Sequence, residues 1–169
     1  MKSEIRVLGI DTSLRSTGIG VVEMRGNKMV AVEYGVIKTP SKRLHSECLI
    51  RLNQGIADVV ARTKPAVAAI EGIFFCKNVK TALILGEARG VVINACAMQG
   101  LKVYEYAPRK VKQAVVGYGA ADKGQVQKMV TRLLGLDKEP QEDASDALAI
   151  AICHLHNRTG YSALEPEPI

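Results

Sequence analysis

The residues best able to do chemistry in this chain are four acids placed at the ends of apolar segments. Asp11 and Glu71 each end a short apolar run that is typical of a buried strand. Asp143 and Asp146 open the last predicted helix, and their spacing puts both on one helical face, about 5–6 Å apart. Because a buried carboxylate without a partner costs several kcal/mol, these acids need cations, hydrogen-bond donors or water.

Some of these acids also have a purely structural interpretation. Asp11 can cap the turn that follows its strand. Acids in the first turn of a helix, such as Glu142 and Asp143, favour the helix dipole and cap free N–H groups. Asp146 differs from them because it precedes the apolar run at 147–152 and is expected to point toward the sheet.

If the last helix packs over the ends of the two strands, the four carboxylates meet in one pocket. Such a cluster repels itself by several kcal/mol unless hard cations neutralise it. Ligands that are all oxygens select Mg²⁺ or Mn²⁺ rather than Zn²⁺. Two such ions about 3.5–4 Å apart form the template for phosphodiester hydrolysis, in which one activates water and the other stabilises the leaving oxygen.

The elements that must position these acids follow from the apolar pattern, which alternates strands and helices and predicts an α/β protein. Three early strands joined by short turns imply an antiparallel start to the sheet. A later run of small apolar residues suits a central parallel strand buried on both faces. The predicted strands are 6–11, 16–24, 29–38, 66–70 and 102–106. Helices are predicted from 40 to 64, from 79 to 98, from Pro108, from 126 to Gly135 and from 141 to 156.

Length and charge narrow the class of protein further. A chain of 169 residues is most simply one domain, predicted at 1–157, with a flexible tail at 158–169. A net charge of +6 favours an anionic partner such as nucleic acid, although it can also serve solubility alone. A basic segment at 102–132 precedes an acidic one at 137–146. This order suits a polyanion held over a metal centre.

Several classes of protein are disfavoured. The four cysteines form no C-x-x-C pair, so we expect buried thiols in a reducing compartment rather than a zinc site or disulfides. We find no signal-peptide pattern and no apolar run long enough to span a bilayer, so a cytoplasmic protein is predicted. His45 gives no clear signal, and His154 and His156 are expected at the surface after the last helix.

Beyond the acids, short motifs follow one another along nearly the whole chain except the tail. The main ones are Leu8-Gly9-Ile10-Asp11, Ala69-Ile70-Glu71 with Phe74, Leu85-Gly86-Glu87-Ala88-Arg89-Gly90, Tyr104-Glu105-Tyr106-Ala107-Pro108, Val111-Lys112-Gln113, Gly119-Ala120-Ala121-Asp122-Lys123 and Asp143-Ala144-Ser145-Asp146-Ala147. In this order the sequence resembles the RuvC family of Holliday-junction resolvases.

The resemblance implies an RNase H-like fold, a mixed five-stranded sheet flanked by helices, in a homodimer. It implies Mg²⁺-dependent cleavage of four-way DNA junctions by paired symmetric nicks during recombination and repair. Two ions per active site are implied, with Mn²⁺ able to replace Mg²⁺. The partner proteins implied by the family are RuvA, which binds junctions, and the RuvB motor.

The resemblance also assigns roles by position. The family's four catalytic, metal-binding acids match Asp11, Glu71, Asp143 and Asp146. Lys112 and Lys123 match basic residues near the scissile phosphate, and Phe74 matches an aromatic that stacks on bases at the opened crossover, worth about 1–3 kcal/mol per base. Core packing is the alternative for Phe74, and is the role expected of Phe75. Further DNA contacts are expected from Lys77, Arg89 and Arg109.

One departure and three alternatives remain. Thr12-Ser13 stands where family members commonly have Pro-Gly, which predicts an altered turn rather than lost activity. The closest alternative is another RNase H-like nuclease that acts on RNA or an RNA–DNA hybrid. An ATP-binding protein of the actin and sugar-kinase type shares the opening strand and turn but needs a second half. A junction-binding module with a decayed site would not keep all four acids.

Overall fold

The structure is a computed structural model that describes residues 4–73, 77–158 and 166–169. In these ranges the elements, in chain order, are β1 (Ile5–Asp11), β2 (Ser16–Arg25), β3 (Lys28–Lys38), α1 (His45–Thr63), β4 (Val67–Glu71), α2 (Val79–Met98), β5 (Lys102–Tyr106), α3 (Pro108–Val116), α4 (Lys123–Leu134) and α5 (Glu142–Asn157). Each predicted strand and helix has a counterpart here. The predictions for Phe74 and Phe75 lie outside the described residues.

The five strands form one sheet in the order β3-β2-β1-β4-β5. β2 is antiparallel to β1 and β3, while β4 is parallel to β1 and β5 is parallel to β4. The predicted antiparallel start and mixed sheet are therefore confirmed. Ile10 of β1 is in register with Ile70 of β4, so Asp11 and Glu71, one residue further on, leave the sheet at the same edge.

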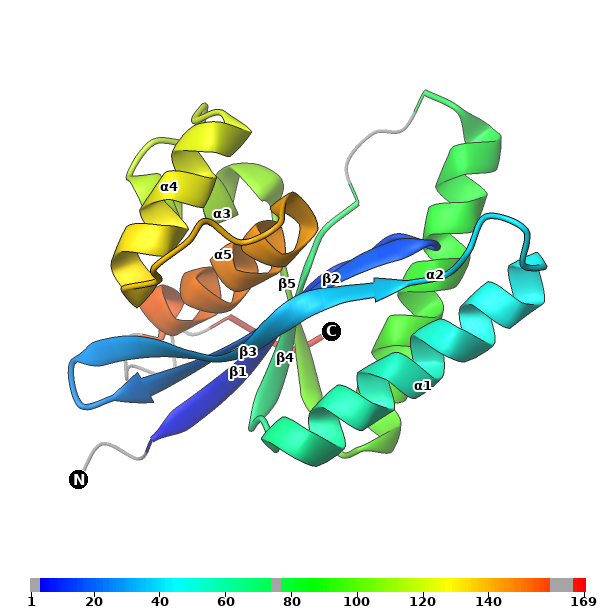
Figure 1. Ribbon diagram of the computed structural model, residues 1–169, viewed down its shortest axis with the longest axis horizontal. Helices are drawn as coiled ribbons and strands as arrows, with labels where there is room; N and C mark the ends of the chain where they lie inside the picture. Colours follow the sequence, from blue (N-terminus) through cyan, green and yellow to red (C-terminus); the bar gives the residue numbers. More distant parts are fainter. Residues whose placement is uncertain (1–3, 74–76, 159–165) are drawn as a thin grey trace.

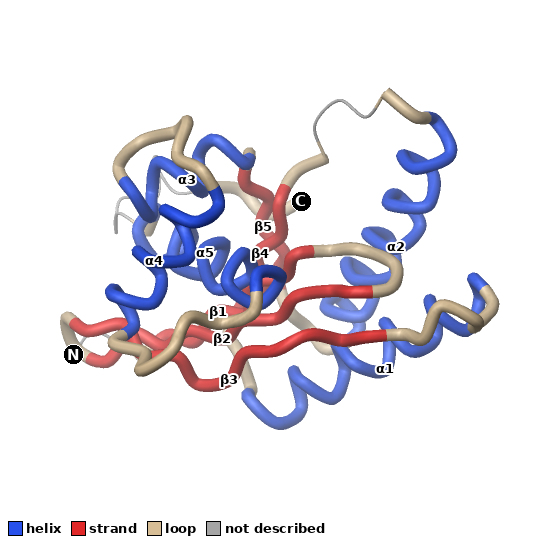
Figure 2. Tube along the Cα trace, turned by 45° about the horizontal axis from the view of Figure 1, so that its top comes forward, coloured by secondary structure: helices blue, strands red, loops and turns tan. Residues whose placement is uncertain are grey.

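Helices cover both faces of this sheet. α3, α4 and α5 lie on one face and α1 and α2 on the other (Figure 1 and Figure 2). The alternation of side chains along β1 supplies both cores, because Val7 packs with α5 while Leu8 and Ile10 pack with α1 and α2. β1 is the middle strand and is buried on both sides, as its continuous apolar run predicts.

Two glycines let α5 approach the sheet closely. A Cβ atom at Gly9 would lie 2.0 Å from the carbonyl oxygen of Ala147. One at Gly18 would lie 1.9 Å from the carbonyl oxygen of Asp143. Only glycine fits at either position, and the close contact brings the first turn of α5 over the ends of β1 and β2.

Two helices begin where capping residues place them rather than where the apolar pattern starts. The first helix begins at His45 instead of near 40, because Leu44 is its N-cap and donates its backbone N–H to Glu47 Oε2 at 2.9 Å. α4 begins at Lys123 instead of 126, because the Asp122 carboxylate accepts the N–H of Gln125 at 2.8 Å.

The predicted surface position of His154 is wrong. α5 continues through Asn157, and His154 is only 3% exposed on its inner face. Its Nδ1 is hydrogen-bonded to the Tyr106 hydroxyl at 2.8 Å, and its ring stacks at a tilt against Tyr104. Burial lowers the pKa of His154 to about 4, so it is a neutral core residue. His156, two residues further along α5, is exposed as expected.

The helix α2 is unusual because it is apolar on its outer side as well as its inner side. Ala88, Val92 and Cys96 face the core, whereas Val79, Leu83 and other outward residues are exposed. By length and composition this helix is long and apolar enough to cross a membrane, contrary to the prediction that no run reaches that length. It packs along α1 on the sheet, so its outer side is an apolar surface of a folded domain.

Candidate active site

Three of the four predicted acids and both predicted lysines line one hollow of about 250 Å³ at the edge where β1 and β4 end. Five different elements (β1, β4, α3, α4 and α5) supply one such side chain each. The charged lining residues are Asp11, Glu71, Lys112, Lys123 and Asp146. The structure thus brings together residues that span more than 130 positions of the sequence.

The acids in this hollow raise one another's pKa values. The pKa of Asp11 is raised to about 7, mainly by burial and then by the charges of Asp146, Glu71 and Asp143, in that order. Burial is also the main cause of the raised pKa values of Glu71 and Asp146. Burial and, to a smaller extent, mutual repulsion thus disfavour the charged form of all three carboxylates, and a bound cation would favour it.

Asp143 lies beside the hollow rather than among the residues that line it. Its Oδ2 accepts a hydrogen bond from the Ser16 hydroxyl at 2.5 Å. Ser16 is the first residue of β2, so this bond ties the start of α5 to the strand that it crosses. The charge of Asp143 nevertheless reaches Asp11, whose pKa it raises.

Lys123 is the basic residue in closest contact with the acids. Its ammonium pairs with Glu142 and lies 3.6 Å from Asp146 Oδ2. The hydrogen bond with Glu142 is the main cause of the raised pKa of Lys123. Lys112 lies further round the hollow on α3, where its charge lowers the pKa of Glu71 against the larger effect of burial.

The donor set fits a hard divalent cation, although the acids must draw together to bind one. The candidate ligands are carboxylate oxygens, which such ions prefer. The buried Thr12 hydroxyl, next to Asp11, has no hydrogen-bond partner within the described residues and adds an oxygen at the same edge. In the described ranges, no three acids, histidines or cysteines are yet close enough to hold one ion.

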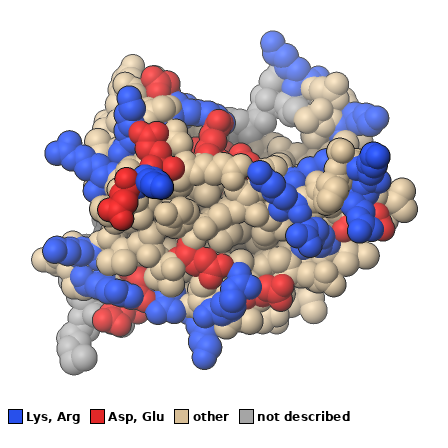
Figure 3. All heavy atoms as spheres, viewed as in Figure 1, with Lys and Arg blue, Asp and Glu red and all other residues tan. Residues whose placement is uncertain are grey.

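The expected DNA contacts divide into two kinds. Lys77, before α2, and Arg109, in the first turn of α3, are exposed. Arg89 instead turns inward, where its guanidinium donates to the carbonyl oxygen of Glu71 at 2.8 Å and pairs with Glu105. On the face drawn in Figure 3, Lys and Arg side chains gather over α4 at one side and over α1 and α2 at the other.

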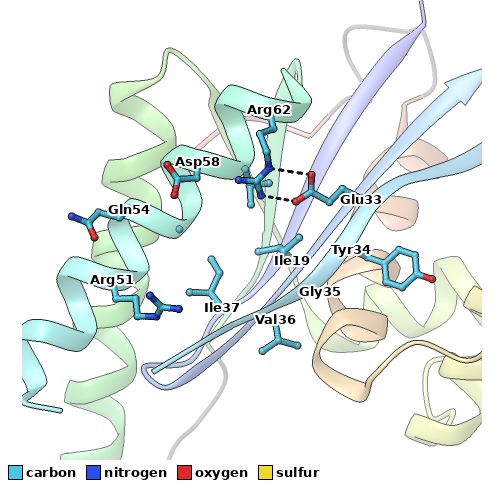
Figure 4. Close-up of a pocket in the computed structure, with 12 residues that line it drawn as sticks. Ile19, Glu33, Tyr34, Gly35, Val36, Ile37, Arg51, Gln54, Asp58 and Arg62 are labelled. Carbon is cyan, nitrogen blue, oxygen red and sulfur yellow. Dashed lines mark hydrogen bonds and ion pairs between the residues drawn. The ribbon is translucent and has the colours of Figure 1, made fainter. Parts of the chain in front are cut away.

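A second hollow, of about 340 Å³, lies between β3 and α1 and contains none of the predicted site residues. Figure 4 shows that the Arg62–Glu33 ion pair crosses it from α1 to β3. Arg51 and Asp58 also line it, so its charges are of both signs. It lacks the cluster of like charges that marks the hollow at the ends of β1 and β4.

Sequence reasoning missed three residues that contact the predicted site residues. Ser16, Glu105 and Glu142 each contact a predicted site residue, but nothing in the sequence pointed to these contacts. The Ser16–Asp143 contact joins residues 127 positions apart, which only the packing of α5 on β2 brings together. Glu105 was visible as part of the motif at 104–108, without any sign of its partner.

Comparison with known proteins gives one consistent family. Residues 7–154 match the family described as crossover junction endodeoxyribonuclease RuvC. The chain is 48% identical over 158 residues to a protein of that name from Geobacter sp. (strain M21), covering 94% of this chain and 96% of that protein. It is 49% identical over 153 residues to one from Chloroflexus aggregans, covering 90% and 93%.

A solved structure agrees in fold over nearly the whole chain. The structure titled "T. thermophilus RuvC in complex with Holliday junction substrate" superposes with a TM-score of 0.89 at 34% sequence identity. The match covers 98% of this chain and 99% of that one. The fold is RNase H-like, as the resemblance implied.

Proposed function

The chain belongs to the RuvC family of crossover junction endodeoxyribonucleases, a family of Holliday-junction resolvases, and from this premise we propose that its active site is the acidic hollow at the ends of β1 and β4. The observation that carries the proposal is the meeting of Asp11, Glu71 and Asp146 with two lysines in that hollow. The four-way junction is proposed as the substrate because the 34% identical T. thermophilus structure is titled as a complex with a Holliday junction.

The proposed cofactor is Mg²⁺, with Mn²⁺ able to replace it, as two ions in each active site. The residues proposed to hold the ions are Asp11, Glu71, Asp143 and Asp146. When bound, such ions polarise the scissile phosphate and lower the pKa of water. The raised pKa of Asp11 supports this assignment, because a carboxylate beside other carboxylates gains most from a nearby cation.

The chain's own groups bind and orient the scissile phosphate. Lys112 and Lys123 are proposed to stabilise the negative charge that develops on the phosphate during cleavage. Both line the hollow with the acids, so a phosphate over the carboxylates lies within their reach. The hydrogen bond from Ser16 holds Asp143 to β2, which limits how far the first turn of α5 can move. Cleavage is proposed to leave 5′-phosphate and 3′-hydroxyl ends.

The proposed assembly is a two-fold homodimer, because two symmetric nicks need two active sites. The apolar outer side of α2, with Val79 and Leu83 exposed, supports this helix as the contact between subunits. Its many small residues permit close packing of a second helix. Light scattering on the purified protein measures its mass and therefore its oligomeric state. A monomer at the concentrations used for cleavage assays would contradict the proposed dimer.

The remaining DNA contacts are proposed from exposure and from the family resemblance. Lys77 and Arg109 are exposed, and Lys112 and Lys123 line the hollow. Phe74 is proposed to stack on bases at the opened crossover, although it lies outside the described residues. RuvA and RuvB are the proposed partner proteins, and the proposed compartment is the cytoplasm. The proposed domain organisation is a single domain at 1–157 followed by a flexible tail.

One experiment separates this function from its closest alternative. The protein is incubated with Mg²⁺ and equal amounts of a synthetic four-way junction, the matching linear duplex and an RNA–DNA hybrid. We expect cleavage of the junction by paired nicks and little cleavage of the other two. Preferred cleavage of the hybrid would favour a ribonuclease of the same fold.

Asp11→Asn is expected to abolish junction cleavage and keep junction binding, because it removes a proposed ligand without adding bulk. Asp58→Asn is the matched control, since Asp58 is an exposed acid of the hollow between β3 and α1. It should cleave like the unmodified protein. Unchanged cleavage by Asp11→Asn would refute the proposed site.

A further inference from the structure

We propose that Arg89 is a positioning residue that fixes the end of β4, and with it Glu71, rather than a DNA contact. The proposal rests on the proposed role of Glu71 in the active site. Arg89 lies on α2 and reaches across to the edge of the sheet where β4 ends. It lines a hollow of about 200 Å³ that also contains Asp11 and Glu71.

The guanidinium of Arg89 holds two strands at once. Its Nη1 donates to the carbonyl oxygen of Glu71 at 2.8 Å, and its Nη2 pairs with the Glu105 carboxylate. Glu105 lies on β5 beside Ile70 of β4 in the parallel register. The planar guanidinium can make both contacts in one fixed geometry, which a lysine ammonium cannot reproduce.

The backbone that follows Glu71 is held by the same neighbours. Gly72 donates its N–H to the carbonyl oxygen of Tyr106 at 2.8 Å. A Cβ atom at Gly72 would lie 3.0 Å from Glu105 Oε1, so the Glu105 carboxylate packs directly against this turn. Arg89, Glu105 and the β5 backbone therefore fix the exit of β4 from the sheet, and the exit sets where the Glu71 side chain points.

The burial and charge of Arg89 argue against a phosphate contact. Its side chain is only 14% exposed, and the adjacent Glu105 carboxylate offsets its charge. The Arg62–Glu33 pair also joins an arginine on a helix to a glutamate on an edge strand. It differs because Arg62 is 56% exposed and lies in the hollow between β3 and α1 (Figure 4). That pair is a natural control for the effect of breaking an Arg–Glu bridge.

The test compares Arg89→Lys and Glu105→Gln with Arg62→Lys and Glu33→Gln in the full-length protein. For each variant we measure kcat and KM for junction cleavage, junction affinity without cleavage, and the Mg²⁺ concentration that gives half-maximal rate. A positioning role predicts that Arg89→Lys lowers kcat by about 10- to 100-fold and raises the Mg²⁺ requirement, with junction affinity little changed. Glu105→Gln should move both quantities in the same direction, and the control pair should move neither.

A DNA contact predicts a different pattern. Arg89→Lys would then keep kcat, and Glu105→Gln would tighten junction binding by removing a negative charge, so either result overturns the proposal. Circular dichroism and melting temperature show whether each variant folds. Glu105 is itself partly exposed, so Glu105→Gln keeps the test valid if the arginine variant does not fold. The effect of Mg²⁺ on the melting temperature gives a readout that is independent of cleavage.

The two proposals can fail separately. If Glu71→Gln cleaves junctions normally, the proposed active site is wrong and the role of Arg89 falls with it. If Glu71→Gln is inactive while Arg89→Lys keeps its kcat and Mg²⁺ dependence, only the positioning role is overturned.

Discussion

The two ends of β1 carry buried charges that are arranged in opposite ways. Near its start, Arg6 is in register with Glu23 of β2 and pairs with it at 2.5 Å, and Arg25 pairs with the other oxygen of the same carboxylate. Glu23 is only 3% exposed, yet the hydrogen bonds from Arg25 and Arg6 lower its pKa. At the far end of the strand, Asp11 faces other acids and its pKa is raised to about 7.

This difference separates a structural charge from one that we propose to be functional. Glu23 has a structural role. Arg6 and Arg25 donate hydrogen bonds to its two carboxylate oxygens, and the bond from Arg6 joins β1 to β2. Among the described residues no arginine forms a hydrogen bond or ion pair with Asp11, and Lys123 only partly offsets the surrounding acids. The same chain that pairs the Glu23 carboxylate leaves the charges around Asp11 uncompensated, and this is where we propose that a cation binds.

The largest expected effect comes from removing one charge at each end of β1. Asp11→Asn should lower junction cleavage by roughly 10³-fold or more while the fold is kept. Glu23→Gln should keep cleavage per folded molecule but lower the free energy of unfolding by about 2 kcal/mol, because two charge-assisted hydrogen bonds are weakened. Cleavage assays with matched urea titrations measure both. Equal losses of activity in the two variants would contradict the division of roles.

The next largest effect concerns the lysine that contacts the acids. Lys123→Gln should lower cleavage by roughly 10²-fold and junction affinity much less, because it removes a positive charge proposed to stabilise the phosphate during cleavage. Lys128→Gln is the matched control, since Lys128 is exposed on the same helix and does not line the hollow. If both variants lose affinity and keep their rate, Lys123 serves only to bind DNA.

A smaller effect is expected where glycine lets α5 reach the acid end of the sheet. Gly18→Ala would place a Cβ atom 1.9 Å from the carbonyl oxygen of Asp143 and should push the first turn of α5 away, at a cost of about 1–3 kcal/mol in stability. Cleavage should fall as Asp143 and Asp146 move with it. Gly35→Ala is the control, because a Cβ atom there has open space. A Gly18→Ala protein as stable and active as that control would refute this packing.

The sequence predicted the acid end of the sheet better than the contacts that support it. Asp11 and Glu71 could be placed because each ends an apolar run, and parallel strands bring such ends to one edge. Asp146 could be placed because the apolar run after it must face the sheet. These inferences use local pattern and sheet geometry only, and the meeting of the three acids required nothing more.

The residues that were misplaced or missed depend on side-chain direction. The sequence shows that Arg89 is basic, but not that it turns inward to Glu71 and Glu105 instead of outward. His154 was expected at the surface because it was taken to follow the last helix, whereas it lies within α5 and its side chain is buried. Direction of this kind is set by tertiary packing, which a periodic pattern does not encode.

The smallest effect, and the sharpest test of the comparison, is the opposite dependence of stability on pH at the two ends of β1. In the folded protein Asp11 keeps its proton up to about pH 7, whereas its ordinary pKa is 3.8. The unfolded chain therefore binds fewer protons than the folded one between these values, and raising the pH lowers the free energy of unfolding. Glu23 behaves in reverse, since its pKa is lowered and its stabilisation is lost as the pH falls below about its ordinary value of 4.5.

Urea titrations in EDTA at pH 4 to 8 separate the two contributions. Asp11→Asn should lose much of the decline in stability between pH 5 and 8, and so exceed the unmodified protein in stability at pH 8. Glu23→Gln should be less stable above pH 5 and show a shallower loss below it. Added Mg²⁺ should stabilise the unmodified protein at pH 8 more than Asp11→Asn, because ionised acids bind the cation and a neutral amide does not. If stability depended on pH in the same way in both variants, the two ends of β1 would not differ in charge compensation. The argument for a cation site beside Asp11 would then fail.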